Sequence, residues 1–177
     1  MLRKILIASA IALVALMIII SLRPDTFRLS RSTLVQAPPD RVFSQVNDFH
    51  HWDAWSPWAK LDPNSKATFE GAASGKGAIF RWSGNDKVGE GRQEIIECQP
   101  PSRILIQLDF IKPFAATNQT EFTFQPEAGG TRVTWTMSGQ NNFIAKAFSL
   151  FMDCEKMVGP DFEKGLSNLK ALVESQH

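Results

Sequence analysis

The fold is decided by residues 117–138, TNQTEFTFQPEAGGTRVTWTMS, in which two alternating segments flank a loop rich in glycine. Bulky apolar residues occupy every second position on both sides of the loop, as Phe122 and Phe124 do before it and Trp135 and Met137 do after it. Alternation of this kind is typical of half-buried strands, and a short loop between two of them is typical of a β-hairpin.

Comparable segments precede this hairpin along the chain. They are rich in β-branched or alternating apolar residues and end at glycine or proline, which predicts strands at residues 27–37, 67–70, 78–83, 88–98 and 103–111. The connections between them are short, which favours antiparallel pairing. With the hairpin, these segments predict a single antiparallel sheet of about seven strands.

Two other segments have the apolar spacing of helices. Pro38-Pro39-Asp40 starts a short helix whose apolar residues continue to Phe49. After Gly139 apolar residues recur at three and four, which predicts an amphipathic helix of about 30 residues, kinked or broken at Gly159-Pro160 because proline lacks a backbone donor. An antiparallel sheet must cover its apolar face, and only this last helix is long enough. We therefore expect residues 24–177 to form one α+β domain.

Residues 1–23 have a different composition from the rest of the chain. Ile5 to Leu22 is apolar apart from two serines, and its length of about 18 residues is about 27 Å of helix, close to the thickness of a bilayer core. The run does not end in a small-x-small cleavage site, so we expect an uncleaved transmembrane helix, with a signal peptide as the alternative. Arg3 and Lys4 favour an N-terminus inside, although arginines also follow the run. We expect the domain on the outer, periplasmic or extracytoplasmic, face.

The composition argues against several classes of function. The net charge is +1 and the sequence has no basic run, so nucleic acid is not an expected partner. Cys98 and Cys154 are too few for a zinc ribbon and fit buried side chains, with a disulfide as the alternative. The adjacent His50 and His51 would point about 100° apart on a helix and so cannot chelate one metal. We expect no metal and no cofactor.

Several short motifs occur in a fixed order along residues 27–174. They are Ala37-Pro38-Pro39-Asp40-Arg41-Val42-Phe43, Trp52-x-x-Trp55-x-Pro57-Trp58, Gly75-Lys76-Gly77-Ala78, Glu97-Cys98-Gln99-Pro100, Gly129-Gly130-Thr131-Arg132-Val133-Thr134-Trp135 and Gly159-Pro160-Asp161-Phe162-Glu163-Lys164-Gly165-Leu166. This ordered set resembles the START-like (SRPBCC) helix-grip superfamily, of the polyketide cyclase/dehydrase and lipid-transport type. The resemblance implies a seven-stranded sheet curled around the C-terminal helix, with an apolar cavity between them. It implies no reaction, because this superfamily contains carriers, receptors and enzymes.

The strand expected at 88–98 carries the candidate catalytic residues. Glu90, Arg92 and Glu94 share one face of that strand by alternation. If this face points inward, two carboxylates and a guanidinium lie in an apolar cavity with shifted pKa values and a possible acid/base role. If it points outward, the three residues form a solvated cross-strand charge set. The inward case would favour an enzyme of the cyclase/dehydrase kind, acting on a hydrophobic, polyketide-like substrate.

The large apolar residues indicate either a plain core or a ligand cavity. Each strand places its bulkiest apolar groups on one side, and tryptophan and methionine are typical of adaptable pockets. The expected ligand-binding residues are Trp55, Phe80, Trp82, Phe110, Phe122, Trp135, Met137, Phe148 and Met152. We expect a membrane-anchored, non-catalytic binding domain for a small hydrophobic or lipid-like ligand. The alternatives are the enzyme above and a protein-interaction module in which the tryptophan segment 52–58 docks a partner.

Overall fold

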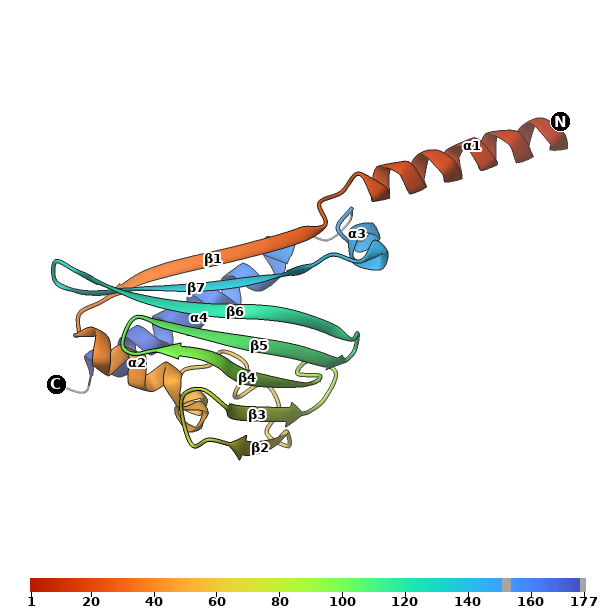
Figure 1. The fold of residues 1–177 in the computed structure, drawn as a ribbon. Coiled ribbons are helices and arrows are strands. Elements are labelled where there is room, and N and C mark those ends of the chain that lie inside the picture. The colour runs from red at the N-terminus through yellow and green to blue at the C-terminus, as the bar shows by residue number, and fades with distance from the viewer. Residues whose placement is uncertain (151–153, 176–177) are drawn as a thin grey trace.

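The computed structural model describes residues 1–150 and 154–175 (Figure 1). Within these residues seven strands form one sheet in the order β1-β7-β6-β5-β4-β3-β2, and every neighbouring pair is antiparallel. The strands are β1 (Thr26–Val35), β2 (Lys66–Gly71), β3 (Ala78–Ser83), β4 (Glu90–Gln99), β5 (Arg103–Lys112), β6 (Ala116–Glu127) and β7 (Gly130–Gln140). The predicted helix-grip architecture, a curved antiparallel sheet with a C-terminal helix and an apolar N-terminal helix, is confirmed.

The helices lie before, between and after the strands. They are α1 (Leu2–Ser21), α2 (Pro39–Asn47), the 3-10 helix η1 (Phe49–Ala54), α3 (Phe143–Phe148) and α4 (Cys154–Glu174). Pro39 begins α2, where its missing N–H costs nothing because the first turn has no intrahelical acceptor for it. The helices α2 and α4 cover one face of the sheet, which we call the inner face, and the opposite side is the outer face (Figure 1).

The single long helix expected after Gly139 is two helices. α3 ends at Phe148, and α4 begins at Cys154 and continues through Pro160 to Glu174. Of the two outcomes expected at Gly159-Pro160, a break does not occur, and a kink stays a prediction. The apolar spacing does not distinguish the two helices, because both have the same period. They nevertheless cover different surfaces: Leu166 of α4 is buried against the sheet, whereas α3 has no buried residue.

α4 is held along β1 by polar contacts as well as by apolar packing. Arg31 of β1 donates from Nε to Oε1 of Glu163 at 2.7 Å, and Lys170 donates from Nζ to the carbonyl of Leu34 at 2.9 Å. Gly159 leaves room for the Arg31 guanidinium, because a Cβ at this position would lie 2.5 Å from Nη2 of Arg31. The helix is therefore fixed over one edge of the sheet.

The two ends of the sheet have different neighbours (Figure 1). β1 begins and β7 leads into α3 at one end, which we call the α3 end; the β6–β7 hairpin lies at the other, the hairpin end. α1 leaves the α3 end and extends away from the sheet, with Ile20 its one buried residue. With a mean hydropathy of 2.6 over its most apolar window, α1 is the one helix among the described residues that is long and apolar enough to cross a membrane, a test that signal sequences also pass.

Candidate functional site

The strand register brings the predicted sheet residues onto the inner face. Directly opposed residues of antiparallel strands point to the same side. Trp135 is opposite Phe122, and the Trp135 ring stacks on Phe162 of α4 with 4.0 Å between centroids. Trp82 and Phe110 are both opposite Gly91, so they share a face as well. The alternation in the sequence therefore groups these side chains correctly.

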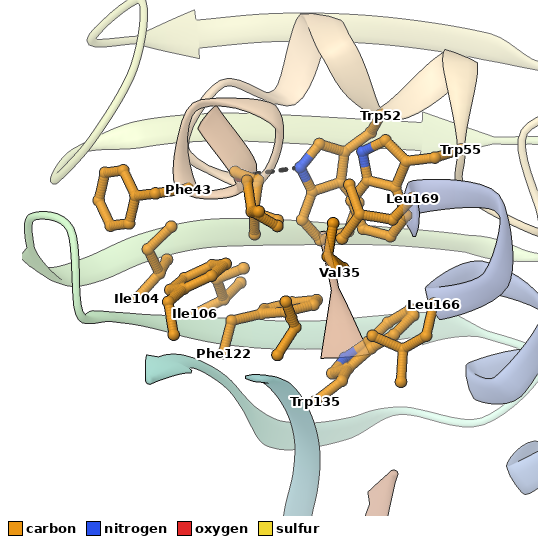
Figure 2. Close-up of a cluster of buried hydrophobic side chains, with 14 of the residues drawn as sticks. Val35, Phe43, Trp52, Trp55, Ile104, Ile106, Phe122, Trp135, Leu166 and Leu169 are labelled. Atoms are coloured by element: carbon orange, nitrogen blue, oxygen red, sulfur yellow. Dashed lines mark hydrogen bonds between the residues drawn. The ribbon is translucent and has the colours of Figure 1, made fainter. Parts of the chain in front are cut away.

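Towards the hairpin end, the inner face is a filled core, shown in Figure 2. Trp55 and Phe122 are fully buried, and Trp135 and Met137 are 2% and 7% exposed. The Trp135 ring lies 4.9 Å from that of Phe122 and 5.8 Å from that of Trp55, so side chains occupy the space in which we expected a cavity. These four predicted ligand-binding residues pack the domain.

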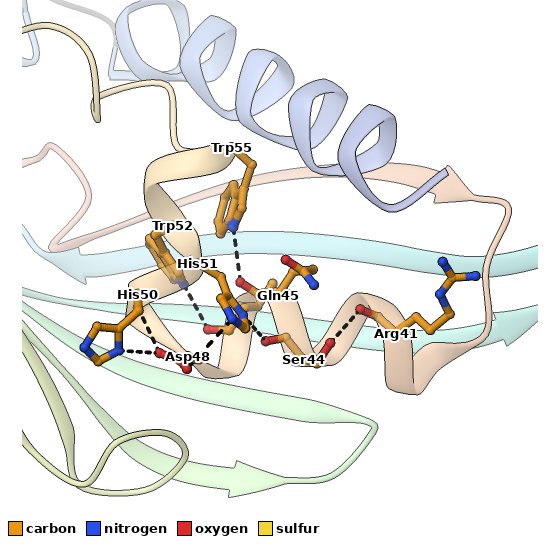
Figure 3. Close-up of polar contacts among 9 residues, drawn as sticks. Arg41, Ser44, Gln45, Asp48, His50, His51, Trp52 and Trp55 are labelled. Atoms are coloured by element: carbon orange, nitrogen blue, oxygen red, sulfur yellow. Dashed lines mark hydrogen bonds and ion pairs between the residues drawn. The ribbon is translucent and has the colours of Figure 1, made fainter. Parts of the chain in front are cut away.

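The tryptophan segment is part of this core because its indole groups are satisfied by α2 (Figure 3). Trp52 donates from Nε1 to the carbonyl of Val46 at 2.9 Å, and Trp55 donates to the carbonyl of Gln45 at 3.1 Å. Trp52 is 8% exposed and Trp55 is fully buried. The rings of Trp52 and Trp55 therefore face inward and do not contribute to a docking surface, whereas Trp58 of the same segment is half-buried.

Asp48 shapes the start of η1, next to the tryptophans. Its carboxylate accepts hydrogen bonds from the backbone N–H of His50 at 2.9 Å and from Nδ1 of the His50 ring at 2.7 Å (Figure 3). Burial alone would raise the pKa of Asp48, but the hydrogen bonds from His50 and the electrostatic effect of His50 and His51 together lower the pKa below the ordinary value of 3.8. His50 thus bonds to the residue that caps η1, whereas Nδ1 of the His51 ring lies 3.1 Å from the Ser44 carbonyl. The described residues hold no cluster of ligands suited to a metal.

Towards the α3 end, the inner face opens. One row of directly opposed residues crosses the sheet here from β3 to β1: Phe80, Gln93, Leu108, Asn118, Gly139 and Phe27. The next row lies closer to the α3 end and consists of Trp82, Gly91, Phe110 and Ala116. The large apolar members of both rows are only half-buried, in contrast to the core. We call the following seven residues the open half of the inner face: Phe27, Phe80, Trp82, Gln93, Leu108, Phe110 and Asn118.

The Trp82 ring packs directly over the backbone of β4 because residue 91 of that strand is glycine. A Cβ on Gly91 would lie 2.3 Å from Cζ2 of Trp82, so any larger residue would displace the ring. The indole donates from Nε1 to the carbonyl of Val88 at 3.1 Å, and its ring meets Phe110 edge-on at 6.1 Å between centroids. Trp82 and Phe110 form an aromatic corner in which both rings are only half-buried.

Two amide side chains in the open half were not among the predicted site residues. Gln93 and Asn118 are 8% and 9% exposed, although both are polar. Alternation could have identified them: Gln93 is on the face opposite Arg92, and Asn118 shares the face of Phe122. Trp135 adds a third polar group to the interior, because its Nε1 is buried without a hydrogen-bond partner among the described residues.

Of the two remaining predicted ligand-binding residues, the structure describes Phe148 alone. Phe148 of α3 is 50% exposed, and its ring centroid lies 6.1 Å from that of Phe114 in the β5–β6 connection. Met152 lies outside the described residues. A hollow of about 470 Å³ lies at the α3 end of β1, β6 and β7. Most of its lining side chains, such as Arg28 and Gln119, belong to the outer face. None of the nine predicted ligand-binding residues lines it.

The candidate catalytic residues point outward. Arg92 forms an ion pair with Glu94, and its Nη1 lies 3.6 Å from Oδ2 of Asp109 in β5. Nζ of Lys112 lies 2.8 Å from Oε2 of Glu90. Their neighbours in β4, among them the inner-face residue Gln93, occupy the opposite side. The outward case therefore holds: Glu90, Arg92 and Glu94 belong to a cross-strand set of charges. They do not form the acid/base site inside an apolar cavity that the enzyme alternative required.

The surroundings of Cys98 in the described part of the chain do not activate its thiol. It is a free thiol, half-buried, with Sγ 3.2 Å from Oδ1 of Asn47. Burial raises the pKa of Cys98, although a hydrogen bond from the Lys76 backbone opposes the shift. A thiol with a raised pKa is a poor nucleophile at neutral pH.

Comparisons with known proteins agree with this fold. None of the curated proteins matches the chain. Among solved structures, protein CV1439 from Chromobacterium violaceum is 21% identical, with 86% of this chain and 99% of that chain covered and a TM-score of 0.59. The Aha1 dimer protein from Colwellia psychrerythraea is 14% identical, with 84% and 96% covered and a TM-score of 0.61. The di-domain ARO/CYC protein StfQ of the steffimycin biosynthetic pathway is 12% identical, with 85% and 51% covered and a TM-score of 0.61.

These identities are too low to show more than a shared fold. The family model described as polyketide cyclase/dehydrase and lipid transport matches residues 26–174, which is most of the chain and includes the whole sheet and α4. This agrees with the helix-grip resemblance in the sequence. The chain belongs to the polyketide cyclase/dehydrase and lipid transport family.

Proposed function

We propose that this protein is a membrane-anchored binding domain for a small hydrophobic or lipid-like ligand, which it holds on the open half of the inner face. The observation that carries the proposal is the change in burial along that face. Residues such as Phe122 are fully buried near α4, whereas Trp82 and Phe110 are half-buried although they belong to the same apolar surface. Apolar area left in water is the area that an apolar ligand can cover, at about 25 cal/mol per Å² before the costs of binding.

The open half also carries groups that can orient a ligand. Gln93 and Asn118 flank Leu108 in the register, so two amides lie among aromatic and aliphatic side chains. Each amide offers both a donor and an acceptor, and no charged side chain shares their row. A mainly apolar site with a few polar groups is typical of small-molecule binding. This arrangement favours a ligand with an uncharged hydroxyl, carbonyl or amide group on an apolar body.

The anchor in this proposal is α1, with the boundary at residue 23 and the domain at 24–177. The helix has 20 residues, about 30 Å at the helical rise, which matches the hydrocarbon core. Arg3 and Lys4 at its start favour an N-terminus inside and a domain on the outer face. A tether of this kind keeps the open half close to membrane-soluble compounds. Carriage without catalysis is proposed because Glu90, Arg92 and Glu94 lie on the outer face.

A photocrosslinking experiment on the full chain tests the proposal. The protein, extracted in detergent, is incubated with an uncharged photoreactive alkyl probe, and the crosslinked peptides are identified by mass spectrometry. We expect crosslinks on α1, which contacts the micelle, and separately on β3 and β5 around Trp82 and Phe110. Phe110→Asp should abolish the β5 crosslink, whereas Ile111→Asp, the matched change on the outer face of the same strand, should retain it. Crosslinks confined to α1 would contradict the proposal.

A further inference from the structure

α3 presents an apolar surface that the core does not use. Phe143, Ile144 and Phe148 are 52%, 63% and 50% exposed, and Phe114 of the β5–β6 connection beside them is 70% exposed. We call these four residues the apolar rim. At about 100° per residue, Phe143, Ile144 and Phe148 fall within one arc of about 140° on the helix. The arc continues through the Phe114–Phe148 ring contact onto the sheet end.

Polar contacts tie α3 to the segment that follows α1. Arg23 donates from Nη2 to the carbonyl of Ser149 at 2.9 Å and from Nε to its Oγ at 3.2 Å. Asn141 donates from its backbone N–H to the carbonyl of Asp25 at 2.7 Å. Lys146 pairs with the Asp25 carboxylate, and its position on α3 lies outside the apolar arc. α3 is therefore oriented by its polar side against the exit of α1, with its apolar side free.

This geometry fixes the level of the apolar rim relative to a bilayer. If α1 spans the hydrocarbon core, Ser21 at its end lies near the membrane surface. The contacts of Arg23 and Asp25 then hold α3 at the same level. Short amphipathic helices with bulky apolar residues on one side bind in the interfacial layer of membranes, where such a surface is covered. The described part of the chain offers no other cover for it.

We propose that the apolar rim inserts into the surface of the same bilayer that α1 crosses, and that it holds the α3 end of the inner face against the lipid. This inference rests on the anchored form of the proposed function and adds a second point of membrane contact. Trp82 and Phe110 of the open half lie at this end of the sheet. A ligand dissolved in the membrane then reaches the open half along the rim without crossing bulk water.

The test uses full-length protein reconstituted into phosphatidylcholine vesicles that contain doxyl-labelled lipid. In a Cys98→Ser, Cys154→Ser background, an environment-sensitive fluorophore is attached through Ile144→Cys on the rim or, as control, through Ala128→Cys in the exposed β6–β7 hairpin loop. We expect a blue-shifted emission and strong doxyl quenching for the label at 144, and neither for the label at 128. A further Phe143→Asp substitution should reduce the quenching at 144 while the protein still floats with the vesicles.

The outcomes separate this inference from the proposed function. If the protein floats with the vesicles but the labels at 144 and 128 are equally exposed to water, the rim does not dock and the inference is wrong, while the anchored binding domain stands. If the protein does not float with the vesicles, α1 is no anchor and both fail. Photocrosslinking of β3 and β5 in detergent does not depend on docking, so it reports on the ligand site alone.

Discussion

Replacing Trp135 by alanine tests whether the inner face near α4 is a filled core. The ring is 2% exposed and stacks on Phe162 at 4.0 Å and on Phe122 at 4.9 Å, so its removal leaves a gap between aromatic neighbours that are themselves buried. Truncation of a buried tryptophan costs about 3–5 kcal/mol. Because Nε1 of Trp135 has no partner, its removal also relieves a desolvation cost of about 1–3 kcal/mol. We therefore expect a loss of stability near the lower bound, about 3 kcal/mol.

Thermal unfolding of the full chain in detergent measures this loss. For a domain of about 150 residues, 3 kcal/mol lowers the melting temperature by about 6–12 °C. Trp135→Phe keeps a ring and removes the unpaired N–H, so it should cost less than about 1.5 kcal/mol. Phe110→Ala, in the open half, should cost about 1–1.5 kcal/mol because the ring is only half-buried. A Trp135→Ala protein that melts within about 2 °C of the wild type would refute the filled core, since so small a shift means less than about 1 kcal/mol.

Three further changes probe separate parts of the domain. Gly91→Ala should cost about 1–3 kcal/mol in thermal melts, because the new Cβ would overlap the Trp82 ring; a melt unchanged from the wild type would show that the ring does not lie over β4. The folded pKa of Asp48 is lowered, so its carboxylate stabilises the fold above the unfolded pKa of 3.8 and loses this effect as the pH falls through the folded value. Asp48→Asn should therefore be less stable than the wild type at neutral pH, and the difference should disappear once the pH is below the folded pKa. A constant difference across a pH series of denaturation curves would contradict this. Burial raises the pKa of Cys98, so peptide mapping should show slower alkylation of this thiol in the native than in the denatured protein, and equal rates would mean that it is exposed.

The sheet and the grouping of its apolar residues could be predicted because alternation is a local property. Phe122 and Trp135 share a face in any antiparallel pairing that buries both. For β4, alternation places Arg92 and Gln93 on opposite faces but does not indicate which of these faces points inward. The choice depends on Trp82, which packs over Gly91 and leaves the Arg92 side of the strand outward. That contact joins two strands and is not visible in either alone.

Whether the inner face was hollow could not be predicted either. Alternation indicates that Trp135 points toward α4, but the distance to that helix is set by residues on it. Gly165 permits a close approach, since a Cβ there would lie 2.8 Å from the Trp135 ring, and Phe162 then stacks on the indole. The division into α3 and α4 was missed for a related reason: Phe143 and Leu166 fit one helical period, although the first is exposed and the second is buried.

The division of the inner face fits what stability and the proposed binding each require. No disulfide from Cys98 supports the fold, so the domain depends on its packed aromatic core for stability. A binding surface needs the opposite, apolar groups that are not fully covered before the ligand arrives. One continuous surface meets both demands when α4 closes over Trp135 and leaves Phe110 half-buried. Because α1 joins the sheet at the open end, the anchored form proposed above would place the uncovered apolar groups on the membrane side and the sealed core away from it.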